Sequence, residues 1–229
     1  MDNFLIKYLS ERLQEKEESP ESLNPVITIS REFGCWGNRI AEILCQKLLE
    51  RSKVSGLNQP WKWITREIME KSALDLKVSP EYISDIFNAK QKGTLADIIL
   101  SFGSQYLSNE KIKATITNVV KSYCKDGYVI MVGRASNIIL KDYPKALHVK
   151  LFAPFEWRAE CYRERQNLTV TQSRIQVKEM EKRRAEFLQF FRGSLHEDEI
   201  FDLCFNRKTI NENEIVDTII SILESKKYI

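Results

Sequence analysis

Two glycines three residues apart, Gly34 and Gly37, lie in a turn between an apolar β-branched run and an amphipathic helical pattern. A strand, a glycine turn and a helix in this order direct backbone N–H groups and a helix N-terminus at an anion. Arg31 and Arg39 flank the turn, and nearby cations strengthen the binding of an anion. The pattern indicates a phosphate site, although a tight turn without a ligand fits the glycine spacing equally well.

The turn departs from the usual phosphate loop, G-x-x-x-x-G-K-[ST], because neither a lysine nor a serine or threonine follows Gly37. Trp36 adds bulk at a point where a phosphate must approach the backbone closely. Asn38 follows Gly37, and Arg39 supplies a cation one residue later, about 100° around the helix. Cys35 stands beside the predicted helix N-terminus, which would lower its thiol pKa. Because neither histidine of the chain is near it in sequence, we predict that Cys35 is a spectator.

A further arginine comes at the end of another apolar run. Residues 128–132 read as a buried strand that ends at Gly133 and Arg134. The carboxyl ends of parallel strands meet at one edge of a sheet, so Arg134 is expected beside the glycine turn. A guanidinium there can hold a phosphate through two parallel N–H bonds, whereas the alternative is a structural ion pair with a nearby carboxylate.

Two predicted helices on either side of Asn167 carry further cations. Arg158 and Arg165 are seven residues apart on the first helix and therefore share a face. Arg183 and Arg184 lie on the second helix. Charge runs on helices usually face solvent, and for any single arginine that interpretation is preferred. Two basic patches that bracket one helix connection also fit a lid over a triphosphate.

Short apolar runs that alternate with helical patterns position these residues. The runs predict buried strands at residues 26–29, 61–65, 128–132, 146–152 and 201–205. The pattern predicts an α/β fold whose parallel sheet has helices on both faces and binds ligands at the carboxyl ends of the strands. Residues 66–126 read as almost wholly helical, with helix starts at Ser79 and Ser108. Thr171 is predicted to cap a long helix, and an amphipathic helix follows at 214–223.

Composition limits the class of protein. With 229 residues the chain can form a full core in one domain, and a net charge of +3 argues against a bulk nucleic-acid binder. Five scattered cysteines without a C-x-x-C pair, and two isolated histidines, predict neither a disulfide framework nor a zinc site. The apolar runs are too short for a bilayer and no signal segment is present. We therefore predict a protein of the reducing cytoplasm with no membrane partner.

Residues 1–24 form a separate appendage in this interpretation, and the main domain is 25–229. Apolar residues at helical spacing, Phe4, Leu5, Tyr8, Leu9 and Leu13, precede a charged stretch. We expect a surface helix that docks on its own domain or on the partner of a homodimer.

Six segments in this order resemble the cytidylate kinase-like family: ITISREFG, TREI, VGRASNIIL, HVKLFAPFEWR, KRRAEF and FDLCFN. The resemblance covers nearly the whole chain from Pro25 onward. It implies the three-layer P-loop nucleoside monophosphate kinase fold, with a five-stranded parallel sheet. It also implies a helical monophosphate-binding region at 66–126 and a helical lid at about 158–192.

The resemblance assigns roles to the residues above. The backbone of residues 34–38 would hold the donor phosphates, with Arg31 beside them. Arg66 begins the monophosphate-binding region, and Arg134 would hold the acceptor's phosphate or its pyrimidine end. The cations expected to act on the transferring phosphoryl group are Arg39, Arg158, Arg165, Arg183 and Arg184.

The activity that the resemblance implies is in-line transfer of the γ-phosphoryl group of ATP, with Mg²⁺, to a nucleoside monophosphate such as CMP or dCMP. Because the acceptor is already an anionic oxygen, arginines and amides suffice without a general base. Trp36 and the missing hydroxyl after Gly37 keep a second hypothesis open, a nucleotide sensor of the same fold without turnover. A protein that binds RNA or polyphosphate through its basic helices is a third hypothesis, which the near-neutral charge opposes.

Overall fold

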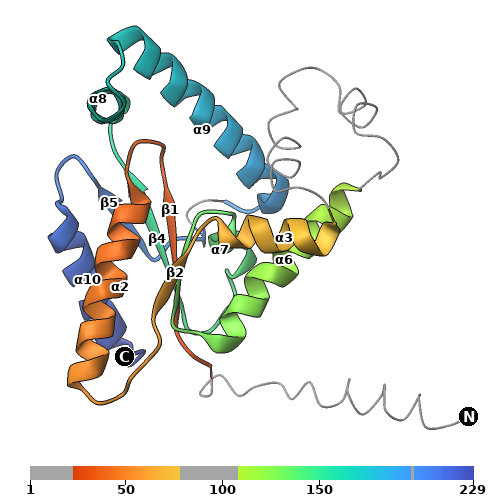
Figure 1. Ribbon diagram of the computed structural model, residues 1–229, viewed down its shortest axis with the longest axis vertical. Coiled ribbons are helices and arrows are strands. Elements are labelled where there is room, and N and C mark those ends of the chain that lie inside the picture. The colour runs from red at the N-terminus through yellow and green to blue at the C-terminus, as the bar shows by residue number, and fades with distance from the viewer. Residues whose placement is uncertain (1–22, 78–107, 197–198) are drawn as a thin grey trace, which may run out of the picture.

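Five short parallel strands form one sheet in the order β2-β3-β1-β4-β5 (Figure 1). A computed structural model of the protein describes residues 23–77, 108–196 and 199–229. The strands are β1 (Val26–Arg31), β2 (Lys62–Ile64), β3 (Val129–Val132), β4 (Ala146–Phe152) and β5 (Leu203–Asn206). β1 lies between β3 and β4, so the turn that follows β1 is at the middle of the carboxyl edge of the sheet.

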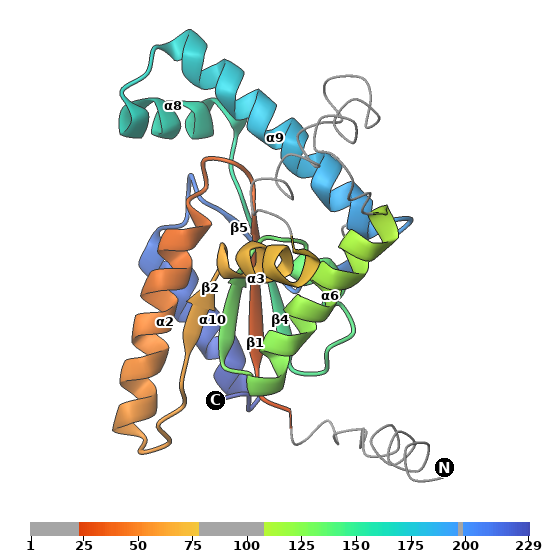
Figure 2. The same ribbon diagram turned by 45° about the vertical axis from the view of Figure 1, so that its right-hand side comes forward.

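Helices cover both faces of the sheet and its carboxyl edge (Figure 2). On one face lie α2 (Gly37–Val54) and α10 (Glu212–Ser225). On the other face lie α3 (Glu67–Leu76), α6 (Asn109–Asp126) and the short α7 (Ser136–Ile139). Above the carboxyl edge lie α8 (Phe155–Gln166) and the long α9 (Val170–Arg192), which extends toward α6.

Both faces of the sheet are buried, because the central strands have helices on both sides. Ile27 and Ile29 of β1 pack in the core with α2 and α10, whereas Val26 packs in the second core with α3 and α6. A strand buried on both faces needs a continuous apolar run rather than an alternating one. The predicted α/β fold with a five-stranded parallel sheet is confirmed.

One polar pair is buried within the sheet. Thr28 Oγ1 of β1 and His148 Nδ1 of β4 lie 2.7 Å apart, and both side chains are buried. His148 Nε2 has no hydrogen-bond partner among the described residues. Burial lowers the pKa of His148, and the Asp202 carboxylate and the backbone of Leu140 and Lys141 oppose that shift in part. The imidazole is therefore neutral at neutral pH.

Replacement of His148 by glutamine is expected to reduce the acid sensitivity of the fold. The folded-state pKa of His148 lies below its unfolded value, so its stability contribution is complete above about pH 6.5 and declines as the pH falls further. The slope for one group is at most about 1.4 kcal/mol per pH unit. Urea unfolding of both proteins between about pH 7.5 and 5.5 measures the difference. Equal pH slopes would contradict this account.

Several predicted element boundaries differ from the structure by one or two residues. The cap of α9 is Thr169 rather than Thr171, because Thr169 and Gln172 form a reciprocal capping box. The last strand begins at Leu203 rather than two residues earlier, because pairing with β4 starts there, opposite Val149.

The described ends of the predicted helical region 66–126 are helical. α3 lies at its start, and Ser108 caps α6 by accepting a hydrogen bond from Lys111 N at 3.2 Å. The predicted helix start at Ser79 and nearly all of residues 1–24 lie outside the described residues, so the division into domains stays a prediction. No helix in the described ranges is long and apolar enough to cross a membrane.

Candidate active site

The turn after β1 contains backbone amides without a hydrogen-bond acceptor among the described residues. Gly34 has a φ of 92°, in the left-handed region, and Trp36 is the N-cap of α2. The amide of Cys35 donates to a carbonyl within the turn at 3.1 Å. The amides of Trp36, Gly37 and Asn38 donate to no described residue. These three amides stand at the N-terminus of α2, where unpaired donors and the helix dipole favour an anion.

Three arginines from distant parts of the chain gather beside this turn. Arg31 ends β1, Arg134 follows β3, and Arg184 is on α9. Among the described residues, none of the three forms an ion pair with a carboxylate. The hydrogen bond that orients one of them runs from Arg134 Nε to Thr65 O, at 3.4 Å.

The pKa values of these arginines reflect first their burial and then the charges of neighbouring arginines. Burial is the main cause that lowers the pKa of each, to about 10 for Arg184. The charge of Arg184 lowers the pKa of Arg31 further, and the charge of Arg134 acts on both. All three guanidiniums stay charged at neutral pH. The cluster therefore repels itself and would be stabilised by a bound anion.

Two glycines make room for Arg31. A Cβ at Gly37 would lie 3.2 Å from Arg31 Cδ, closer than side chains usually pack. A Cβ at Gly133, where φ is 73°, would overlap the Arg31 guanidinium at Nη1. Without side chains at these positions Arg31 extends across the turn. Its guanidinium can supply the positive charge that a lysine after the second glycine would otherwise provide.

Two cavities meet at Arg31 and Arg184, and Arg134 lines neither of them. The larger has a volume of about 450 Å³, and besides the turn its lining includes the aromatic residues Phe33, Trp36, Trp63 and Tyr162. The smaller has a volume of about 250 Å³, and its lining includes Ser30, Asn137, Lys150 and Glu181. Arg31, Glu32 and Arg184 line both cavities. An anionic group at their junction would therefore contact the same guanidinium groups from either side.

Residues 26–209 match the sequence profile of the cytidylate kinase-like family. The chain belongs to this family. Its fold is the α/β P-loop kinase fold. No curated protein matches the sequence.

Several solved structures are similar to this chain at low sequence identity. An uncharacterized protein from Eubacterium ventriosum has a TM-score of 0.59 and 19% identity, over 88% of this chain and 99% of that protein. A shikimate kinase from Acinetobacter baumannii has a TM-score of 0.47 and 13% identity, over 89% and 95% of the two chains. TT1252 from Thermus thermophilus has a TM-score of 0.47 and 9% identity, over 90% and 98%. The similarity to the Eubacterium ventriosum protein is evidence for the fold and for nothing more specific.

Arg158, which the resemblance assigns to the transferring phosphoryl group, is held by carboxylates in this structure. Its side chain is 6% exposed and pairs with two carboxylates, Glu32 at 3.2 Å and Glu181. It also donates to the carbonyls of Ala153, at 2.8 Å, and Phe33, at 3.0 Å. Arg158 thus joins α8 and α9 of this cytidylate kinase-like protein to the turn after β1.

The other predicted cations differ in their surroundings. Arg39 is 50% exposed and pairs with Glu42 at 2.9 Å and with Glu212 at 3.7 Å, so it stands at the rim of the larger cavity. Arg165 is exposed and lies over the Trp36 ring, 3.9 Å from the ring centroid. Both line the larger cavity, but neither belongs to the buried cluster.

The contacts of three further predicted residues, Arg66, Arg183 and Asn38, do not assign them a role in binding. Arg66 is exposed at the N-terminus of α3, where its charge lowers the pKa of Arg134 after the larger effect of burial. Arg183 lines neither of the two cavities, and its Nε is buried without a partner among the described residues. Asn38 is exposed in the first turn of α2. Their roles in binding stay predictions.

The pKa of the Cys35 thiol is raised, whereas the sequence predicted that the helix N-terminus would lower it. Its side chain is fully buried, and burial raises the pKa to about 12, which outweighs any effect of the helix N-terminus. A thiol with so high a pKa is a poor nucleophile at neutral pH. The raised pKa agrees with the predicted spectator role.

Two carboxylates of the site were absent from the predicted residues. Glu32 pairs with Arg158 and also accepts a hydrogen bond from Ala153 N at 3.0 Å. Glu181 binds Arg158 from α9. Glu32 could have been identified as a site residue from its position between Arg31 and the first glycine of the turn. Glu181 lies in a run of charged helical residues, where nothing local distinguishes it from a solvent-facing side chain.

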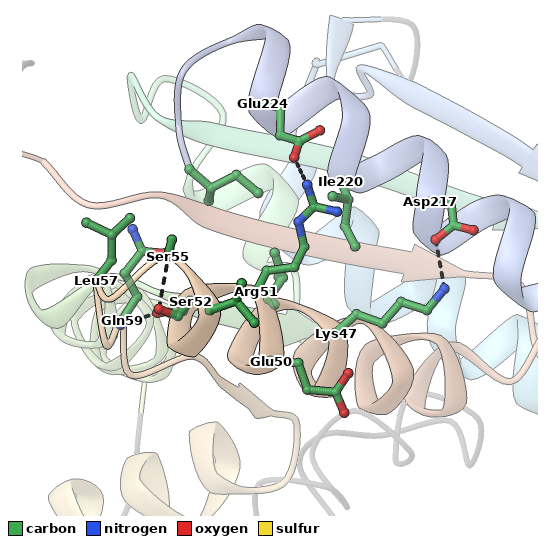
Figure 3. Close-up of a pocket in the computed structure, with 13 residues that line it drawn as sticks. Lys47, Glu50, Arg51, Ser52, Ser55, Leu57, Gln59, Asp217, Ile220 and Glu224 are labelled. Atoms are coloured by element: carbon green, nitrogen blue, oxygen red, sulfur yellow. Dashed lines mark hydrogen bonds and ion pairs between the residues drawn. The ribbon is translucent and has the colours of Figure 1, made fainter.

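A cavity of about 710 Å³ lies elsewhere, along the later parts of α2 and α10 (Figure 3). Because α2 begins at the carboxyl edge of the sheet, this cavity is at the opposite edge from the glycine turn. Two of its cations are already neutralised, since Lys47 pairs with Asp217 at 2.7 Å and Arg51 pairs with Glu224. It therefore does not offer the unpaired positive charge that a phosphate requires.

Replacement of Gly133 by alanine is expected to weaken phosphate binding about ten- to hundredfold, because the new Cβ displaces the Arg31 guanidinium. Gly56 is a matched control, since its φ is 72° and nothing lies within 4 Å of an added Cβ. Both substitutions strain the backbone by roughly 1–2 kcal/mol. Calorimetry with inorganic tripolyphosphate compares the two variants. Equal affinities would contradict the placement of Arg31.

Proposed function

We propose that the protein transfers the γ-phosphoryl group of ATP to a nucleoside monophosphate, with CMP and dCMP as first candidates. One observation carries the proposal: Arg31 and Arg184, with Arg134 behind them, stand unpaired with any described carboxylate where two cavities meet. Membership of the cytidylate kinase-like family supports the reaction type and the choice of acceptor.

In this proposal the donor occupies the larger cavity, with its phosphates on the amides of Trp36, Gly37 and Asn38. The acceptor occupies the smaller cavity, and its phosphate lies against Arg31 and Arg184. An acceptor oxygen attacks the γ-phosphorus, and the bond to the ADP leaving group breaks as the new bond forms. The protein moves no proton, because the attacking oxygen is already anionic. Its work is positioning and neutralisation of charge.

Mg²⁺ enters the proposal together with ATP. The described residues contain no group of three histidine, cysteine, aspartate or glutamate side chains that could hold a metal ion. The Glu32 carboxylate is already bound to Arg158 and to Ala153 N. Because Mg²⁺ in such enzymes is held largely by substrate phosphates and water, it enters the proposal only as the companion of ATP, and no step is assigned to it.

A nucleotide sensor without turnover is the second candidate. Two features favour it: the bulky Trp36 within the turn, and the lack of a hydroxyl residue after Gly37, where Asn38 and Arg39 are both exposed. A sensor would use the same arginine cluster and the same cavities, so the two functions differ in catalysis and not in binding.

Purified protein mixed with ATP, Mg²⁺ and a panel of nucleoside monophosphates separates these functions. Acceptor-dependent formation of ADP supports phosphoryl transfer, and kcat/KM across the panel identifies the preferred base. Calorimetric binding of a mononucleotide without ADP formation supports the sensor. A protein that neither turns over nor binds a nucleotide would refute both.

Cytoplasmic location and self-association through residues 1–24 remain proposals from the sequence. The proposal needs no membrane partner and no nucleic acid. Gel filtration of the full chain beside a chain that starts at Pro25 tests whether the appendage mediates a homodimer.

A further inference from the structure

Trp36 has a backbone conformation that aromatic residues rarely adopt. Its φ and ψ are 54° and 45°, in the left-handed region where glycine is unstrained. Its side chain makes no capping hydrogen bond to α2, so helix capping does not explain the residue. A strained residue at the wall of a cavity points to a function for its side chain.

The Trp36 ring contributes to a cavity with two kinds of lining. Arg31, Arg184 and the turn amides provide positive charge and hydrogen-bond donors. The indole ring of Trp36 stands in the same lining with Phe33 and Tyr162, whose rings pack edge to face at 4.9 Å. A nucleotide combines a polyanion with a planar ring, and at about 450 Å³ the cavity is of the size that binds such ligands.

One face of the indole is covered by a side chain that is easily moved. The Arg165 guanidinium lies 3.9 Å from the ring centroid, and the residue is exposed near the end of α8. No other hydrogen bond or ion pair ties Arg165 to the described residues. A planar ligand can therefore displace the guanidinium from the ring at a small cost in free energy.

We infer that the Trp36 indole is the platform on which the base of the donor nucleotide stacks. The donor is favoured over the acceptor because the same cavity contains the turn amides that would hold the donor phosphates. Arg165 covers the ring until the base takes its place. This inference rests on the donor half of the proposed function and adds to it a specific base contact. Stacking on an aromatic side chain improves binding about ten- to hundredfold.

Calorimetric binding of Mg–ATP and of Mg–tripolyphosphate to the full chain tests the inference. Tripolyphosphate has the phosphates without the base, so it reports on the amides and arginines alone. Trp36→Gly is expected to weaken ATP binding about ten- to hundredfold and tripolyphosphate binding less than about twofold. Trp36→Phe keeps an aromatic ring and is expected to bind ATP within about threefold of the wild type. Thermal unfolding verifies that each variant is folded.

Unchanged or tighter ATP binding by Trp36→Gly would overturn the inference, because the indole would then only crowd the turn. An equal loss for ATP and tripolyphosphate would also overturn it, since the defect would lie in the phosphate site. Either result leaves the proposed function standing if the wild type forms ADP. The expected Trp36 dependence without ADP formation for any monophosphate would refute the proposed transfer and retain the inference.

Discussion

Replacement of Arg158 by methionine is expected to lower the free energy of unfolding by about 3 kcal/mol, the lower end of the range for breaking a buried ion pair. Methionine keeps an unbranched apolar stem but leaves Glu32 and Glu181 without their cation. It also removes the donor to the Phe33 and Ala153 carbonyls. Since the two carboxylates are 36% and 30% exposed, solvent screens part of the loss.

The matched control is Arg163→Met, on the same helix as Arg158. Arg163 pairs with Glu160 of its own helix at 2.6 Å, and both side chains reach solvent. Its replacement is expected to change stability little. Urea unfolding of the two variants and the wild type measures the difference. Losses of similar size in both variants would show that Arg158 does not join α8 and α9 to the glycine turn.

Replacement of Arg184 by glutamine is expected to weaken the binding of both ATP and the monophosphate about ten- to hundredfold, because Arg184 lines both cavities. In the absence of ligand the same change is expected to leave the free energy of unfolding unchanged or to raise it. Burial and the charge of Arg134 disfavour the charged Arg184 side chain in the folded protein more than the charges of Glu181 and Glu32 favour it, so its removal relieves a net cost. Weaker ligand binding without a loss of stability is expected for a ligand-binding cluster, whereas replacement of a residue in a structural cluster would lower the stability.

Arg174→Gln is the control on the same helix. Arg174 is 48% exposed and pairs with Glu156 at 2.8 Å, away from both cavities. The Arg174→Gln substitution is expected to change neither the nucleotide affinity nor the free energy of unfolding. Calorimetry for affinity and thermal unfolding with and without nucleotide provide the two measurements. An Arg184→Gln protein that is destabilised but binds nucleotide normally would contradict the assignment of this cluster.

Local patterns predicted the parts of the site that depend on neighbouring residues. The apolar runs identified the strands, and the parallel order placed Arg134 at the same sheet edge as the turn between Gly34 and Gly37. Apolar periodicity and turn chemistry act over a few residues, and a single sequence displays them directly. The cap of α9 was missed by two residues because Thr169 and Thr171 are equivalent until the partner Gln172 is considered.

Arg158 and Arg165 illustrate what local patterns could not resolve. Both stand on one helix seven residues apart, and the sequence predicted the same role for them. The structure buries the first, whose backbone packs against Gly34, and exposes the second, which reaches the turn only through its guanidinium over the Trp36 ring. A Cβ at Gly34 would lie 2.9 Å from Arg158 Cβ.

The sequence by itself determined the α/β class, the glycine turn after the first strand and the arginines available to it, because these follow from short-range periodicity and composition. The tertiary structure alone decided how the charges are paired. Glu32 and Glu181 form ion pairs with Arg158. Arg31, Arg134 and Arg184 lie close together, and none of them forms an ion pair with a carboxylate among the described residues. The physical reason is that Coulomb energy depends on the distance between side chains, and packing sets that distance for segments far apart in the chain.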